Sequence, residues 1–174
     1  EMCIRDSLYM ALCRTLIRTY AFEYQSRPDL VLSEANERIL QDARANLFIT
    51  CFYGVLDPVE GSLVYCNAGH NPPILATNDS FNKLFALART GMPIGIEPDA
   101  SWERRTLSFN PGDKLILYTD GITEAQNIRG EFFDEELLLE CILKQQNGTA
   151  FDLQETIMND VREFSLGTPQ SDDI

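Results

Sequence analysis

The chain has 174 residues, 44% hydrophobic and 24% charged, which is the composition of an ordinary soluble protein of one domain. Its 27 acidic residues outnumber 14 basic ones, and a net charge of −13 argues against non-specific nucleic-acid binding, which needs a basic face. The longest apolar run, residues 47–56, is too short to span a bilayer, and no signal-peptide pattern opens the chain. Five scattered cysteines predict free thiols in a reducing compartment, so we expect a cytoplasmic location.

Two helices are predicted at the start of the chain. Leucines recur at helical spacing in residues 8–21, and a second helix extends through Ala43. Residues 47–56 then change character, because they are rich in β-branched and aromatic side chains and apolar on both faces. This pattern predicts a central strand that is covered on both sides.

Further strands are predicted from short apolar runs at 62–67, 73–77, 81–85, 102–109 and 114–119. Turn residues at 57–61, 78–80 and 110–113 separate several of these runs. Because short turns separate most of these runs, we expect hairpins and a largely antiparallel pairing. Two more helices follow, one capped by Asp134 and one that opens with a capping box, Thr149 to Asp152. Helices at both ends with strands between them predict a layered α+β fold.

Two acidic positions are candidates for chemistry. Asp120 stands at the end of a predicted strand in KLILYTDGITEAQN (residues 114–127), and Gly121 lets the backbone turn sharply there. An Asp-Gly pair after a strand is also an ordinary turn, and the dipeptide alone favours that interpretation. Asp172 and Asp173 precede the last residue, where they are either oxygen ligands at the start of a strand or a frayed acidic terminus.

The single histidine, His70, lies in the loop NAGHNPP (residues 67–73). A histidine can act as a general acid or base, but no second histidine and no recognisable cysteine nucleophile accompanies this one. We therefore expect a structural hydrogen-bonding role in a loop that shapes its surroundings. Glycine-rich phosphate loops and a GxSxG nucleophile motif are absent from the sequence.

Four segments taken in order resemble a known family: FYGVLDPVEGSLVYCNAGHNPPIL, GMPIGI, GDKLILYTDGITEAQN and DDI. From about residue 8 onward the chain is similar to the PPM-type metal-dependent serine/threonine phosphatases of bacteria, in their SpoIIE/RsbU-like branch. The resemblance implies an α-β-β-α sandwich of two mainly antiparallel sheets with a dinuclear Mn²⁺ or Mg²⁺ centre between them. It further implies dephosphorylation of phosphoserine or phosphothreonine in a regulatory protein, an anti-sigma-factor antagonist of the STAS type, in bacterial signalling.

The resemblance also assigns residues. The aspartate of the TDG motif is a metal ligand in the family and corresponds to Asp120, and the first aspartate of the terminal motif corresponds to Asp172. Carboxylate oxygens suit hard cations, and a metal-activated water is the nucleophile, so no catalytic side chain is expected. Residues expected to shape the site or support the ligands are Gly121, Asp173, Gly69, His70 and Asn71.

The sequence departs from the family at both ends. The family's first metal motif is missing ahead of residue 8, and EMCIRDS (residues 1–7) reads as a non-native junction. We expect residues 8–174 to be a partial phosphatase domain that is inactive by itself, with a sensor domain upstream and a homodimer in the full-length protein. The missing motif leaves open an inactive interaction module with the phosphatase fold. A receiver domain phosphorylated on Asp120 is a more remote alternative, because receivers have a parallel sheet.

Overall fold

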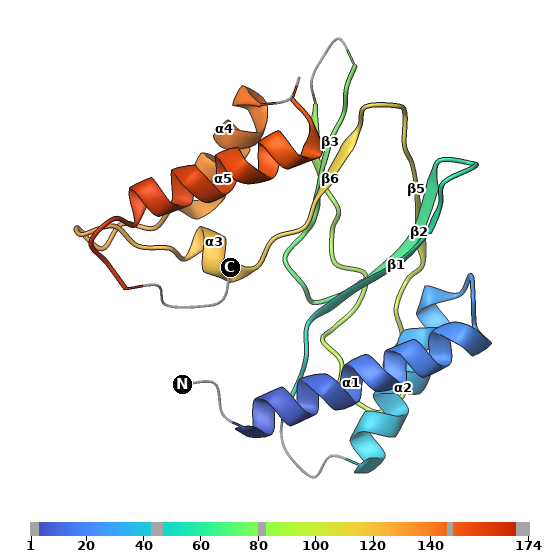
Figure 1. Cartoon of the computed structure of the whole chain (residues 1–174). Coiled ribbons are helices and arrows are strands. Elements are labelled where there is room, and N and C mark those ends of the chain that lie inside the picture. Colours follow the sequence, from blue (N-terminus) through green and yellow to red (C-terminus); the bar gives the residue numbers. More distant parts are fainter. Residues whose placement is uncertain (1–3, 43–46, 80–82, 146–147, 170–174) are drawn as a thin grey trace. The chain divides into compact units, whose positions relative to one another are not determined.

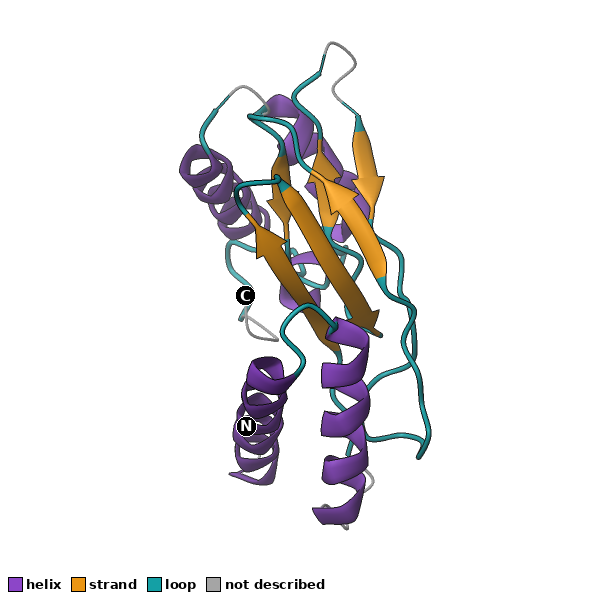
Figure 2. Ribbon diagram, turned by 90° about the vertical axis from the view of Figure 1, so that its right-hand side faces the viewer, coloured by secondary structure: helices purple, strands orange, loops and turns teal. Residues whose placement is uncertain are grey.

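The computed structural model describes residues 4–42, 47–79, 83–145 and 148–169. The chain divides into two compact units, the first made of residues 1–70 and 88–109 and the second of residues 71–87 and 110–174. Each unit contains helices and one three-stranded antiparallel sheet, so the predicted α+β class is confirmed (Figure 1, Figure 2). In the described part of the chain, no helix is long and apolar enough to cross a membrane.

The first unit begins with two helices, α1 (Ile4–Glu23) and α2 (Pro28–Asp42). Its sheet has the order β1-β2-β5, formed by β1 (Cys51–Asp57), β2 (Ser62–Ala68) and β5 (Arg105–Ser108). The hairpin between β1 and β2 closes where the Asp57 carboxylate accepts hydrogen bonds from the next turn, at 2.9 and 3.0 Å.

Helices α1 and α2 and the strands of this sheet share one hydrophobic core. The core forms because Cys66 and Ala68 lie on one face of β2 and pack with the apolar side of the helices. Its buried members are Tyr9, Cys13, Leu32, Ala35, Ile39, Cys66, Ala68, Ile94 and Trp102.

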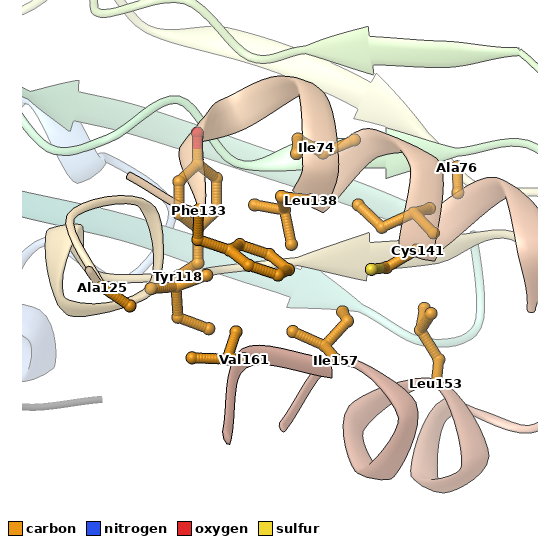
Figure 3. Packing of buried hydrophobic residues seen from close by; sticks show 12 residues of the cluster. Ile74, Ala76, Tyr118, Ala125, Phe133, Leu138, Cys141, Leu153, Ile157 and Val161 are labelled. Carbon is orange, nitrogen blue, oxygen red and sulfur yellow. The ribbon is translucent and has the colours of Figure 1, made fainter. Parts of the chain in front are cut away.

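The second unit has the sheet order β4-β3-β6, formed by β3 (Ile74–Ala76), β4 (Leu84–Ala86) and β6 (Lys114–Ile116). Three helices follow: α3 (Asp120–Thr123), α4 (Asp134–Lys144) and α5 (Ala150–Phe164). Figure 3 shows how α4 and α5 turn their apolar sides toward one another in the core of this unit. The buried members are Ile74, Ala76, Tyr118, Ile122, Ala125, Phe133, Leu138, Cys141, Ile142, Leu153, Ile157 and Val161.

The predicted capping box of α5 is confirmed, and Asp134, the first residue of α4 after the N-cap position Phe133, makes the predicted hydrogen bond. An oxygen of the Asp134 carboxylate accepts the amide of Leu137 at 3.0 Å, which stabilises the start of α4. At α5 the capping box is complete, because Asp152 donates its amide to the Thr149 hydroxyl while its carboxylate accepts the Thr149 amide at 2.8 Å. Both caps could be predicted from the sequence because each involves residues only three positions apart.

Two strand predictions were wrong in detail. The first strand begins at Cys51 and not at residue 47, and β1 lies at an edge of the three-stranded sheet that the structure describes. The turn Asn110–Asp113 forms as predicted, with the Asp113 amide donating to Asn110 at 3.0 Å. It does not close a hairpin, however, because β5 pairs with β2 and β6 pairs with β3.

Candidate metal centre

Asp120 lies where the chain leaves the second sheet. Strand β6 ends at Ile116, and α3 begins at Asp120 after three connecting residues. The Asp120 carbonyl accepts the amide of Glu124 at 2.7 Å, and the next two residues, Gly121 and Ile122, are buried. The backbone at Asp120 is therefore anchored in the core of its unit, while its own side chain is exposed.

The Asp120 carboxylate does not close this turn. Among the described residues, none donates a hydrogen bond to it or forms an ion pair with it. An Asp that serves only to form a turn would accept a nearby backbone amide, as Asp57 does between β1 and β2. Both carboxylate oxygens can thus accept a ligand without breaking a contact that the structure describes.

The chemistry of the donor atoms fits a hard divalent cation, because Mg²⁺ and Mn²⁺ prefer carboxylate oxygens. Asp172 and Asp173, the predicted ligand and its neighbour, lie outside the described residues. Within the described ranges, no group of three or more histidine, cysteine, aspartate or glutamate side chains could hold a metal ion. Asp120 accordingly fits as one oxygen ligand, and a complete centre needs donors from beyond the described part of the chain.

The loop NAGHNPP is held by buried polar contacts in the first unit. Asn67 is fully buried, and its side-chain oxygen accepts the His70 amide at 2.8 Å. The Asn67 backbone exchanges hydrogen bonds with Thr90, one to the Thr90 hydroxyl at 2.9 Å and one from the Thr90 amide at 2.9 Å. The start of this loop is therefore tied to a segment more than twenty residues further along the chain.

Gly69 occupies a position that only glycine fits well. Its φ of +74° is in the left-handed region, and an added Cβ would lie 2.6 Å from Cγ of Pro93. His70 is half-buried, with Nδ1 3.5 Å from the Thr50 hydroxyl, and its carbonyl accepts Nε of Arg89 at 3.4 Å. Asn71 is half-buried and begins the second unit.

Residues that hold the neighbouring loop GMPIGI were not anticipated from the sequence. Asn36 in α2 is 1% exposed and binds the backbone of this loop at Gly95 and Glu97. Trp102 donates its indole N–H to the Met92 carbonyl at 2.8 Å. The one available signal for Asn36 was its position beside Ala35, within the apolar side of a predicted helix.

Comparison with known proteins decides the family. A family model described as Stage II sporulation protein E (SpoIIE) matches residues 4–174. The chain belongs to the SpoIIE family. It is thus a member of the SpoIIE/RsbU-like branch of the PPM-type phosphatases. The resemblance that its motifs indicated is confirmed.

Among curated proteins, the chain is 32% identical over 128 residues to Protein IcfG of Synechocystis sp., covering 74% of this chain and 20% of IcfG. It is 27% identical over 163 residues to the phosphoserine phosphatase RsbU of Bacillus subtilis, covering 90% of this chain and 48% of RsbU. The chain thus spans at most about half the length of these two relatives.

A solved structure shows the fold that this chain shares. The SiaA-PP2C domain of Pseudomonas aeruginosa matches with a TM-score of 0.83 at 18% identity, covering 98% of this chain and 68% of that one. The SpoIIE-family chain therefore shares the fold of PP2C domains. Its antiparallel pairings do not fit a receiver domain, whose sheet is parallel.

Proposed function

We propose that the full-length protein is a metal-dependent phosphatase that removes phosphate from phosphoserine or phosphothreonine in a regulatory protein of bacterial signalling. The observation that carries this proposal is the Asp120 carboxylate, which is exposed on an anchored backbone and has no partner among the described residues. Membership of the SpoIIE family and similarity to the phosphoserine phosphatase RsbU support the same reaction class.

Asp120 and Asp172 would hold the divalent cations, Mn²⁺ or Mg²⁺. When bound, such cations lower the pKa of a coordinated water and neutralise charge on the phosphoryl oxygens. The contribution of this chain is to hold the backbone of the ligand in place. Burial of Gly121 and Ile122 fixes α3, so the backbone at Asp120 loses little freedom when the carboxylate binds a cation. In this proposal Asp173, Gly69, His70 and Asn71 shape the surroundings and perform no proton transfer.

The substrate that we propose is a phosphorylated STAS-type protein, as the family resemblance implies. The same resemblance supports an upstream sensor domain, action as a homodimer and a cytoplasmic location. Residues 8–174 would then form one part of the phosphatase domain of the full-length protein.

The experiment is to incubate the full-length protein with a serine-phosphorylated STAS protein and to measure released phosphate with Mn²⁺, with Mg²⁺ and with a chelator. We expect turnover with either cation and almost none with the chelator. Tight binding of the phosphoprotein without turnover under all three conditions would instead favour the inactive interaction module.

A further inference from the structure

We propose that Arg89 recognises an anionic group, a phosphate or a carboxylate, on the protein substrate. The inference rests on the proposed phosphatase function and adds a specificity residue to it. Arg89 belongs to the first unit, and its side chain contacts the NAGHNPP loop at the His70 carbonyl.

The contacts of Arg89 orient its guanidinium group without neutralising it. Its Nε donates to the His70 carbonyl at 3.4 Å, and the side chain is exposed. No carboxylate within the described ranges forms an ion pair with it, and its two terminal nitrogens have no acceptor there. A guanidinium held by Nε retains the fork of donors that matches a carboxylate or phosphate in two parallel hydrogen bonds.

The carbonyl that holds Arg89 is itself fixed. The His70 amide is bound by the buried Asn67 side chain at 2.8 Å, and Gly69 packs directly against Pro93. Arg89 also adjoins Thr90, whose amide is bound to the Asn67 carbonyl at 2.9 Å. Because both ends of the contact are restrained, Arg89 loses less side-chain freedom on binding than an unrestrained surface arginine would lose.

Because the chain is strongly acidic, a positive group beside this loop favours the binding of an anionic partner there. With a net charge of −13, these 174 residues repel an acidic or phosphorylated partner. Arg105, in β5 of the same unit, cannot offset that repulsion fully, because Glu103 already pairs with it at 2.9 Å. Arg89, which donates to this loop from outside it, has no such partner among the described residues, so its guanidinium group can bind an anion.

The test measures steady-state kinetics of the full-length protein and its Arg89→Ala, Arg89→Lys and Arg104→Ala variants. Arg104→Ala is the matched control, because it removes the same charge from an exposed arginine of the same unit that donates to no atom of the loop. Two substrates are compared, the phosphoprotein and the small monoester p-nitrophenyl phosphate. Melting temperatures of all variants are recorded with the kinetics.

We expect Arg89→Ala to raise KM for the phosphoprotein about 10-fold with little change in kcat, the loss of roughly 1.4 kcal/mol of binding. Arg89→Lys should recover part of this loss, and Arg104→Ala should match the unaltered protein. KM of the unaltered protein should also rise with added salt more steeply than that of Arg89→Ala, since salt screens the contact.

The two substrates identify the source of the anion. A rise in KM for both substrates would mean that Arg89 binds the phosphate that is removed. A rise in KM for the phosphoprotein alone would mean that Arg89 binds an acidic group elsewhere on the partner. Unchanged kinetics of Arg89→Ala with both substrates, beside an active unaltered protein, would overturn the inference. An inactive unaltered protein would instead overturn the proposed function on which the inference rests.

Discussion

The buried carboxamide of Asn36 joins helix α2 to the backbone at Gly95, 59 residues further along the chain. The Gly95 amide donates to Asn36 Oδ1 at 2.8 Å, and Asn36 Nδ2 donates to the Glu97 carbonyl at 2.8 Å. The side chain is 1% exposed, so water cannot replace either contact. One residue thereby fixes the GMPIGI loop against the helices of the first unit.

Replacing Asn36 with alanine should lower the free energy of unfolding by about 2–3 kcal/mol. The change removes two hydrogen bonds and leaves an amide and a carbonyl buried without partners. Urea unfolding of Asn36→Ala beside Glu37→Ala measures the effect, because Glu37 is an exposed neighbour on the same helix. Equal midpoints for the two variants would show that the buried contacts contribute nothing net.

Gly69→Ala should destabilise the protein more than Gly130→Ala does. Both glycines have a positive φ, +74° and +76°, so both substitutions carry a similar conformational cost of about 1 kcal/mol. Only Gly69 has a neighbour in the way, since nothing lies within 4 Å of a Cβ at Gly130. The difference between the unfolding free energies of the two variants therefore measures the cost of the contact between the new methyl group and Pro93. Equal values would mean that the NAGHNPP loop moves to accommodate the methyl group without cost.

Alkaline pH should weaken the fold through its buried thiols. Burial raises the pKa of Cys13, Cys51 and Cys66 to about 11, and burial with a hydrogen bond to Asp160 raises the pKa of Cys141 to about 12. From an ordinary value of 9.0 upward, the unfolded chain loses these protons before the folded protein does, so stability falls as pH rises.

Urea midpoints at pH 8 and pH 10.5 check this dependence. We expect a lower midpoint at pH 10.5, and a smaller drop between the two pH values in Cys141→Ala, which lacks one of the four thiols. Buried tyrosines such as Tyr9 and Tyr118, whose pKa burial also raises, add to the loss at the upper end. Identical midpoints at both pH values would contradict the burial that the structure assigns to these groups.

The capping box of α5 should stabilise the protein at neutral pH and lose the contribution of the Asp152 carboxylate in acid. Thr149→Ala removes the hydroxyl that caps the helix, at a cost of about 1 kcal/mol. Hydrogen bonds from the Thr149 side chain and backbone lower the pKa of Asp152 below its usual 3.8, so its contribution is present above that pH and is lost as pH falls through the lowered value.

Thermal unfolding at pH 7 and pH 2.5 compares Thr149→Ala with Gln154→Ala, an exposed position on the same helix. The gap between the two variants should be larger at pH 7 than at pH 2.5. Acid weakens the hydrogen bond from the Thr149 hydroxyl to the Asp152 carboxylate, while the one from the Asp152 amide to the hydroxyl remains. A gap that stayed constant with pH would show that the Asp152 carboxylate does not take part in the cap.

Local signals in this sequence predicted local structure well. The caps at Asp134 and Thr149 and the Asp57 turn were readable because each depends on residues within a few positions of one another. Hydrophobic spacing likewise predicted the helices α1, α2, α4 and α5, whose apolar sides contribute to the two cores, whereas the short α3 was not predicted. Predicting these features requires no knowledge of which distant segments pack against them.

Contacts between segments that are distant in the sequence could not be predicted from it. The Asn110–Asp113 turn looked like a hairpin, but strand partners depend on the sheet as a whole, and the two strands joined different sheets. A polar residue such as Asn36 gave no indication of which backbone groups it would bind. The same holds for the candidate site. The sequence motif predicted Asp120 as a ligand, whereas only the structure showed that α3 anchors its backbone.

The central claim is that Asp120 holds a divalent cation needed for phosphatase turnover, and Asp120→Asn in the full-length protein tests it most directly. Glu124→Gln is the matched control, because it removes a similar exposed carboxylate four residues away. With Mn²⁺ at a concentration that saturates the unaltered protein, we expect Asp120→Asn to lose about 100-fold or more in kcat/KM, and Glu124→Gln to stay within about twofold. Manganese-dependent turnover of Asp120→Asn equal to that of Glu124→Gln would contradict the account.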